Sequence, residues 1–340
     1  METSDWYALG IPLFLVAIGL EAWLGWRRGL ASYRLHDTLC DLGCGLGGLL
    51  VGVFLGVLTL SLYDLAYRAA AVVRWTAGSP VPWVLGFVGV DFLYYWFHRL
   101  GHEVNLFWAI HAVHHQSEEF NFAVALRQPW FSDAYAILFY WPLPILGVPA
   151  ECFFVAVAGL SLYQVLLHTR LVGRPGPLGW LFNTPSHHRV HHSRDERDLD
   201  RNFGATLIVW DRLFGTFRHE GETEPPYGTT RRFASWNPFW AQVQGFARLA
   251  AAARAAPRPL DRLRIWFAAP ASLPPISEAV PTPLPPGTGA YVVAQYAVLG
   301  ASSIAVLVSA ASALDPTVAS AALFLLASMA VLGGLADGRP

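Results

Sequence analysis

The stretch Val81-Pro-Trp-Val-Leu-Gly-Phe-Val-Gly-Val-Asp-Phe-Leu-Tyr-Tyr-Trp-Phe-His98-Arg-Leu-Gly-His102 decides how the chain is organised. Its apolar run ends at Phe97 and approaches the roughly 20 residues that a membrane-spanning helix needs. The run leads directly into His98 and His102, which are four residues apart and therefore share one helix face. The stretch predicts a membrane helix that ends in a pair of imidazoles.

The composition of the whole chain favours a bilayer environment. Of 340 residues, 54% are hydrophobic and only 14% are charged, against roughly 25% charged residues in a typical soluble domain. A formal net charge of −1 provides no basic field, so we expect no nucleic-acid partner. All basic residues are Arg, and with the many Ala residues this bias is typical of a bacterial protein. We therefore expect an integral protein of a bacterial inner membrane.

Further apolar runs predict an all-α, multi-pass helical membrane protein. The region Ala134–Leu167 is interrupted by three prolines and is compatible with a helical hairpin that enters and returns. Two C-terminal runs, rich in small residues, predict a second hairpin. The candidate spanning helices outside the first hairpin are Trp6–Trp26, Leu39–Leu62, Val81–Phe97, Tyr291–Leu314 and Pro316–Leu335.

The arginines predict an orientation. Arg27, Arg28 and Arg34 follow the first apolar run, and basic loops favour the cytoplasmic side. Threading the helices alternately then places His98 and the polar stretch His168–Thr288 on that same side. The sequence thus predicts a cytosolic helical cap that carries the histidines.

Changes in composition divide the chain into four regions. We expect N-terminal transmembrane helices in 1–80, a histidine-rich catalytic region in 81–220, a proline-rich interfacial linker in 221–289 and a C-terminal transmembrane hairpin in 290–340. Within the linker, Leu260–Phe267 mixes Arg with Leu, Trp and Phe, a pattern suited to a membrane surface.

Histidines are concentrated in a few places. Of the 12 histidines, His168 stands alone near one end of the polar stretch, while His36 and His219 are isolated and fit ordinary surface roles. The others form His98-x3-His102, His111-x2-His114-His115 and His187-His188-x2-His191-His192. Residues at i, i+3 and i+4 lie on one helix face, so each motif presents its rings together.

The number of imidazoles matches a dinuclear metal site. Two metals with four or five nitrogen ligands each use eight to ten rings. The motifs without His187 supply eight, and His168 and His187 are the ninth and tenth. Structural zinc normally takes four ligands that include Cys, and no Cys lies near these motifs. Although imidazole also suits Zn, Cu and Ni, this His-rich, carboxylate-poor set favours two non-haem iron ions that activate O2.

Several polar residues are candidates for supporting roles. Asp91 lies two helical turns before His98 on the same face, so it either hydrogen-bonds a ligand ring or starts a helix or bridges two helices. Glu103 either supports a ligand or lies in a solvated loop. Arg127 and Gln128 fit either a substrate head group or a plain loop, and Tyr94–Phe97 either a substrate entrance or an interfacial belt. Weaker candidates beside the last motif are Asn183, Asp195 and Asn202.

At these residues the chain resembles the fatty acid hydroxylase/sterol desaturase superfamily, and within it the alkylglycerol monooxygenase-like proteins. The stretches that carry the resemblance are Asp91–Asn105, Ala125–Gln128, Asn183–His192 and Ile208–Phe217. The resemblance implies a helical membrane protein whose cytosolic cap holds two irons. It implies the ligands His98, His102, His111, His114, His115, His188, His191 and His192, joined by His168 and His187, and tetrahydrobiopterin or, in its place, a redox protein as external electron donor.

The resulting hypothesis is an O2-dependent monooxygenase that hydroxylates a C–H bond of a lipid, with an ether lipid as the expected substrate. The alternative enzyme is a desaturase or hydroxylase of a sterol, carotenoid or fatty acyl lipid, because the same ligands serve both reactions. A more distant alternative is a membrane metal transporter or metal store. A transporter places its polar ligands near the bilayer midplane, whereas these motifs lie at helix ends and in a polar region.

Overall fold

The computed structural model describes residues 3–174, 176–273, 287–312 and 315–338, and helices are the main regular structure there. In that part of the chain, β structure is limited to two isolated bridges, Phe182 with Leu207 and Ser193 with Tyr227. The all-α prediction is confirmed. The α-helices are α1 Thr3–Arg27, α2 Leu35–Ala70, α3 Pro80–Glu103, α4 Asn105–His115, α5 Phe122–Ala125, α6 Ser132–Tyr140, α7 Pro142–Ile145, α8 Ala150–Leu167, α9 Pro185–His191, α10 Val209–Phe214, α11 Pro238–Ala255, α12 Pro259–Phe267, α13 Thr288–Ser312 and α14 Pro316–Ala336.

Five of the described helices are long and apolar enough to cross a membrane, namely α1, α2, α8, α13 and α14. The predicted span Val81–Phe97 is not among them. It forms the first part of α3, where two prolines, Asp91 and several Tyr and Trp residues lower the mean hydropathy. The prediction of several membrane-spanning helices is therefore confirmed, but α3, which was predicted to be one of them, is not among the five.

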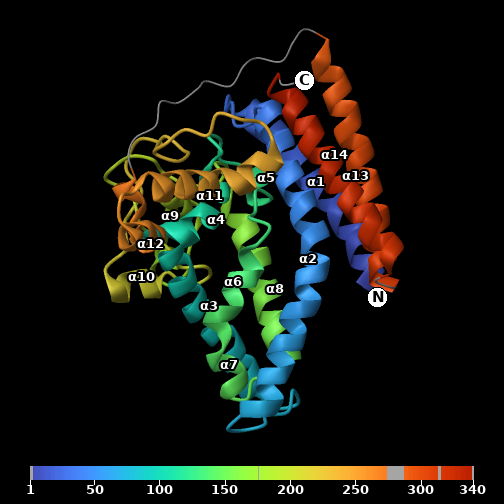
Figure 1. Ribbon diagram of the computed structural model, residues 1–340. Helices are drawn as coiled ribbons and strands as arrows, with labels where there is room; N and C mark the ends of the chain where they lie inside the picture. The colour runs from blue at the N-terminus through green and yellow to red at the C-terminus, as the bar shows by residue number, and fades with distance from the viewer. Residues whose placement is uncertain (1–2, 175, 274–286, 313–314, 339–340) are drawn as a thin grey trace.

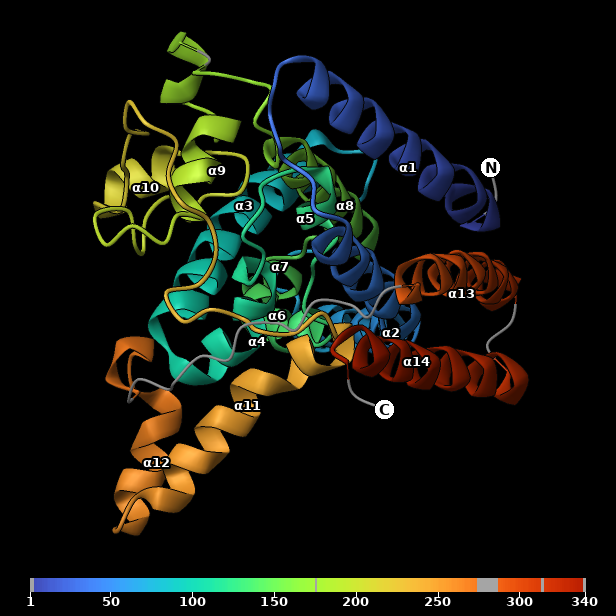
Figure 2. The same cartoon turned by 90° about the horizontal axis from the view of Figure 1, so that it is seen from above.

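The two predicted hairpins are present. In Ala134–Leu167, Pro142 begins α7 and Pro149 precedes α8, so the prolines separate α6, α7 and α8. Figure 1 shows the short α7 at the end of the molecule away from α4 and α9. The C-terminal helices α13 and α14 lie side by side in both views and pack with α2 around Leu50, Leu299 and Met329 (Figures 1 and 2).

The remaining helices, α4, α5 and α9 to α12, form a cap over one end of the bundle (Figure 1). The loop between α1 and α2 lies against it, because Arg28 donates to the Leu171 carbonyl at 3.0 Å and Arg34 pairs with Glu119 at 2.5 Å. The arginine-rich loop and the histidines thus lie at the same end of the helices, as the predicted threading requires.

Much of the predicted linker is ordered in the cap. Asn237 caps α11 through its side-chain oxygen, and Asn105 at the start of α4 holds the end of α12 by donating to the carbonyls of Ile265 and Ala268. Leu260, Leu263 and Phe267 of α12 are exposed, consistent with the predicted interfacial segment. Residues 274–286 of the proline-rich stretch lie outside the described residues.

Candidate metal centre

Nine histidines form two groups in which every ring offers one nitrogen toward its neighbours. Within each group these atoms lie within 4.8 Å of one another, and all the rings are buried. The five-histidine group is His98, His102, His111, His115 and His191, and the four-histidine group is His114, His168, His188 and His192. Either group can hold a metal ion.

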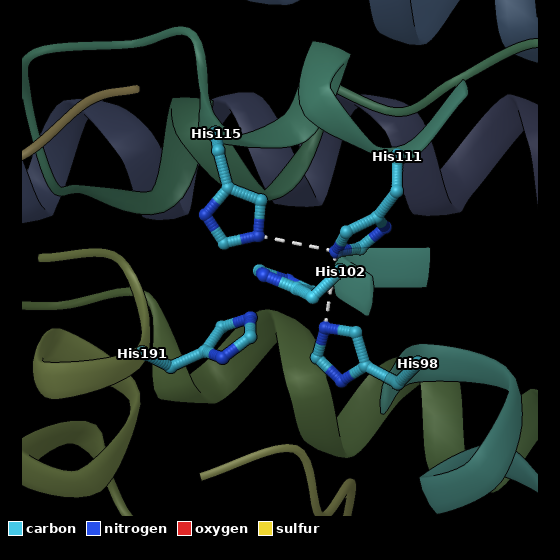
Figure 3. A group of neighbouring side chains, drawn as sticks. All are labelled: His98, His102, His111, His115 and His191. Atoms are coloured by element: carbon cyan, nitrogen blue, oxygen red, sulfur yellow. Dashed lines mark hydrogen bonds between the residues drawn. The ribbon is translucent and has the colours of Figure 1, made fainter. Parts of the chain in front are cut away.

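The five-histidine group draws on three helices. Figure 3 shows the rings of α3, α4 and α9 pointing toward one centre. The Nε2 atom of His111 lies 3.0 Å from that of His98 and 3.1 Å from that of His115. Such close approach of ring nitrogens from separate segments is the arrangement that a shared metal ion requires.

In the four-histidine group, His114 comes from α4 and His188 and His192 from the α9 segment, while His168 directly follows α8. Their Nε2 atoms form a chain, with 3.1 Å from His114 to His168, 3.0 Å from His168 to His188 and 3.2 Å from His188 to His192. The buried ring of Phe120 packs against His168 and His192 and closes this side of the group to water.

The helical motifs supply both groups at once. In α4 the i,i+4 pair His111 and His115 joins the five-histidine group, while His114 joins the other. The α9 segment reverses this pattern, since His188 and His192 join the four-histidine group and His191 the five-histidine group. A step of four residues turns a helix by only about 40°, whereas a step of three turns it about 60° the other way, so the pairs and the single rings point to different centres.

Burial keeps the imidazoles neutral. Loss of solvation lowers the pKa of His114 to about 4. The pKa values of His111, His115, His191 and His192 lie well below the usual range, because burial and then the neighbouring imidazoles disfavour the charged form. Near neutral pH each ring is therefore unprotonated at one nitrogen, the state in which imidazole binds a metal.

Backbone carbonyls fix the direction of four rings. The Nδ1 atom lies 2.8 Å from the Phe203 oxygen in His98 and 2.9 Å from the Arg201 oxygen in His191. In His114 it lies 3.1 Å from the Arg127 oxygen, and in His168 2.8 Å from the Gln164 oxygen. A carbonyl only accepts hydrogen bonds, so Nδ1 carries the proton and the lone pair of Nε2 points into the group.

Two Nε2 atoms test whether a metal fits. Those of His102 and His191 are buried and have no hydrogen-bond partner among the described residues. An orphaned buried nitrogen costs about 1–3 kcal/mol, and a metal ion at the centre of the five-histidine group would satisfy both. The donor set is nitrogen alone, which suits a transition metal rather than Mg²⁺ or Ca²⁺.

The segment 200–204 aligns two of these carbonyls. Asp200 and Asn202 both adopt φ of +57°, a left-handed conformation that is uncommon outside glycine. Asp200 and Asn202 lie on either side of Arg201, and Asn202 directly precedes Phe203. The Arg201 carbonyl faces His191, and the Phe203 carbonyl faces His98. The left-handed turns thus present both oxygens to the rings, and Asn202 donates to the carbonyls of His187 and Arg218 to hold them there.

Asp211 and Asp91 secure this segment. The fully buried Asp211 accepts from the N–H groups of Phe203 and Gly204, each at 2.7 Å. Asp91 accepts from the Thr206 N–H and from Trp210 Nε1, also at 2.7 Å. Its position therefore fits the predicted bridge between segments better than direct support of a ligand ring.

Other candidate residues lie farther from the rings. The side chain of Glu103 is 42% exposed and forms an ion pair with Arg99 at 2.8 Å. This ion pair fits the predicted solvated position better than the support of a ligand ring. His187 belongs to neither group; its ring packs against Phe217 and His219. Of the weaker candidates, Asn183 donates to the Gly204 carbonyl, and Asp195 accepts from Arg197 in an exposed loop.

Arg127 is buried and pairs with Asp41 at 2.9 Å, so its guanidinium is not free for a substrate head group. Asp41 went unnoticed in the sequence, although a carboxylate inside an apolar run is the same signal that singled out Asp91. Of the aromatic run, Tyr94 donates to Gln164 at 2.7 Å, and Gln164 in turn accepts from His168. Tyr94 therefore contacts the side chain of the residue whose backbone carbonyl orients His168.

Residues 83–216 match the fatty acid hydroxylase family. Among curated proteins, the chain is 38% identical over 243 residues to an alkylglycerol monooxygenase of Xenopus tropicalis, covering 72% of this chain and 54% of that protein. The human alkylglycerol monooxygenase is 36% identical over 255 residues, covering 71% and 57%.

An ornithine lipid hydroxylase of Rhizobium tropici is 36% identical over 137 residues, covering 40% of this chain and 41% of that protein. The chain thus spans a little more than half the length of the alkylglycerol monooxygenases that it matches. No solved structure matches the chain.

Proposed function

Because residues 83–216 form a domain of the fatty acid hydroxylase family, we propose that the protein is a membrane-bound non-haem di-iron oxygenase that hydroxylates a C–H bond of a lipid. The observation that carries the proposal is the convergence of nine buried imidazoles into two adjacent groups with neutral, inward-facing nitrogens. Two groups correspond to two ions, with the nine histidines as ligands and His187 outside them.

Two bound iron ions would supply O2 activation and hydrogen abstraction. The chain itself provides the geometry for this chemistry. Carbonyls at Arg127, Gln164, Arg201 and Phe203 hold the Nδ1 protons, so the rings keep their direction when the metal is loaded or lost. Burial of all nine rings keeps water from the reacting carbon and so limits side reactions.

The substrate proposed first is an ether lipid, by similarity to the alkylglycerol monooxygenases. Hydroxylation of the carbon beside the ether oxygen gives a hemiacetal, which breaks down to an aldehyde and a glycerol. The alternative is a fatty acyl lipid, supported by the similarity to the ornithine lipid hydroxylase and to a fatty acid hydroxylase of Lecanicillium. A lipid tail would reach the centre from the apolar helices α3, α6 and α8, which pack around Tyr140 and Phe153.

The electrons would come from an external donor, either tetrahydrobiopterin or a redox protein. The proposed orientation places the cap and the loop of Arg28 and Arg34 on the cytoplasmic face of a bacterial inner membrane, which agrees with the contact between that loop and the cap. Within the chain we propose 1–80 as N-terminal membrane helices, 81–220 as the catalytic region, 221–289 as an interfacial linker and 290–340 as the C-terminal hairpin.

The test is to express the chain in membranes, reconstitute it with iron, and offer matched ether and acyl lipids with a chemical reductant. We expect about two irons per chain and the O2-dependent addition of one oxygen atom to a lipid. His191→Ala and His114→Ala, one from each group, should each lose metal and abolish the oxidation. His219→Ala is the matched control and should retain both.

Retention of lipid oxidation by His114→Ala or His191→Ala would reject the oxygenase assignment. Exchangeable zinc without oxygen uptake would instead favour a metal store or transporter. Oxidation of the acyl lipid without oxidation of the ether lipid would support the oxygenase function and overturn only the proposed ether-lipid substrate.

A further inference from the structure

The helix α2 carries two carboxylates on the face that it turns toward the cap. Asp37 and Asp41 are four residues apart and both are buried, although the same helix is apolar enough to span a membrane. Carboxylates in such a helix are expensive and call for a partner. The partner is Arg127, which lies 86 positions along the chain in the segment after α5.

The guanidinium of Arg127 connects α2 to the end of α4. Its Nη1 atom donates to Asp41 Oδ1 at 2.9 Å and lies 3.6 Å from Asp37 Oδ1, while both members of the Arg127–Asp41 pair are only 1% exposed. Its Nη2 atom donates to Gln116 at 3.2 Å and its Nε atom to the Val113 carbonyl at 3.0 Å. Charge-assisted bonds in a site without water hold such a side chain firmly.

These bonds surround His114 on both sides. The Nε atom of Arg127 donates to the carbonyl of Val113, the residue before His114. The backbone carbonyl of Arg127 accepts from His114 Nδ1 at 3.1 Å. With that proton engaged, His114 Nε2 faces His168 Nε2 at 3.1 Å. A movement of Arg127 would therefore displace both the backbone that carries the ring and the oxygen that orients it.

Two other rings of the four-histidine group, those of His168 and His188, show no such connection to α2 among the described residues. His168 is oriented by the Gln164 carbonyl of its own segment, and His188 Nδ1 has no hydrogen-bond partner among the described residues. His114 is therefore the member whose direction is set by a contact from the membrane-spanning helix.

We propose that Asp41 and Arg127 are positioning residues for the metal centre, because their buried ion pair fixes the carbonyl that orients His114 toward the four-histidine group. The proposal rests on the proposed function only in taking His114 as a metal ligand. It assigns to α2, outside the 83–216 family match, a part in building the centre.

The experiment replaces both members of the closer pair, since removing Arg127 alone would leave Asp41 as an unpaired buried charge that can unfold the protein. Asp37 lies farther from Arg127 and keeps the hydrogen bond that it accepts from the Ser117 hydroxyl. The double variant Asp41→Leu/Arg127→Met places apolar side chains at both positions and keeps the 127 carbonyl, but it removes the polar connection to α2. The matched control is Asp64→Leu/Arg68→Met, which removes the exposed ion pair of the same helix. Both purified full chains are titrated with Co²⁺, and the visible absorption and metal stoichiometry are measured beside the thermal midpoint.

We expect the control to bind two Co²⁺ ions like the parent. The Asp41/Arg127 variant should bind one ion normally and the other about 10- to 100-fold more weakly, the usual effect of losing a residue that supports a ligand, with an altered absorption band for that ion. Asp41→Asn, which keeps an oxygen acceptor for Arg127, should give a smaller loss and decides the matter if the double variant does not fold.

Unchanged affinity and spectrum in the folded double variant, or in Asp41→Asn if it alone folds, would overturn the positioning role. His114→Ala separates this outcome from failure of the proposed function. If His114→Ala loses one ion while the ion-pair variant keeps both, only the positioning proposal fails. If His114→Ala also keeps both ions, the ligand assignment itself is wrong.

Discussion

Replacing Asp211 by Asn tests how the protein holds its ligand-orienting carbonyls. The two oxygens of Asp211 accept from Phe203 N, Gly204 N and the Thr216 hydroxyl at 2.6–2.7 Å, and the side chain is fully buried. The Asn amide can place its oxygen on only one side, so its NH2 group faces at least one N–H donor and leaves it unsatisfied.

The magnitude follows from the bonds that are lost. One charge-assisted bond contributes about 1.5–3 kcal/mol, and a buried donor left unpaired costs about 1–3 kcal/mol. These two values describe largely the same loss, so we expect a destabilisation of about 2–4 kcal/mol. With about 2.1 cal/mol/K of unfolding entropy per residue, such a change lowers the thermal midpoint of the 340-residue chain by roughly 3–6 °C.

The same substitution should loosen the Phe203 carbonyl that faces His98 and so weaken metal binding at the five-histidine group by about 10- to 100-fold. The assays are thermal unfolding of the purified protein and iron content after dialysis against a graded chelator. Asp195→Asn is the control, because that carboxylate lies in an exposed loop and bonds only to its own segment. A thermal midpoint and iron retention equal to the parent's would refute the role given to Asp211.

Three further predictions concern acidity, ligands and packing. Without metal, the unfolding free energy should fall as the pH drops below the ordinary histidine pKa near 6.5. The unfolded chain then binds protons, whereas the buried rings, whose pKa values are lowered, stay neutral in the folded chain. Thermal midpoints at pH 7.5 and 5.5 measure this difference, and equal midpoints would contradict it. His168→Ala should lose one of two bound metal ions by elemental analysis, whereas His219→Ala should lose neither; loss of both or of none from the first would contradict the division into groups. Gly47→Ala should destabilise the protein by about 1–3 kcal/mol, because the added methyl would meet the Trp130 ring at 2.2 Å, whereas Gly52→Ala has open space within 4 Å and should be neutral or mildly stabilising in the same thermal assay.

The spacing of the histidines in the sequence predicted part of the arrangement of the site. The spacing of four residues correctly indicated that His98 and His102, or His111 and His115, share a face. The prediction that each motif presents all its rings together was wrong, because rings three residues apart join different groups. The spacings could not show which rings from different helices meet, because that depends on the crossing of α3, α4 and α9. His187 illustrates the limit: it lies four residues before His191, the spacing of three pairs that do share a group, yet its ring packs against Phe217.

Long-range polar contacts were the part that local patterns could not predict. The sequence left Arg127 between contact with a substrate head group and a plain loop, and only the approach of α2 shows that it is enclosed by Asp41 and Gln116. The segment 200–204 was equally hard to foresee, since left-handed backbone at Asp200 and Asn202 depends on what the surrounding chain enforces. The fold class, in contrast, follows from composition and apolar run length, which are properties of each segment alone.

The exchange of rings between the two histidine groups has a consequence for how the protein acquires its ions. Helix α4 and the α9 segment each supply rings to both groups. The first ion to bind therefore immobilises both segments, and the second ion binds without a further loss of conformational entropy from them. The second ion should therefore bind more readily than the first in the intact chain, while a chain that lacks one ring can still hold an ion in the group that remains complete.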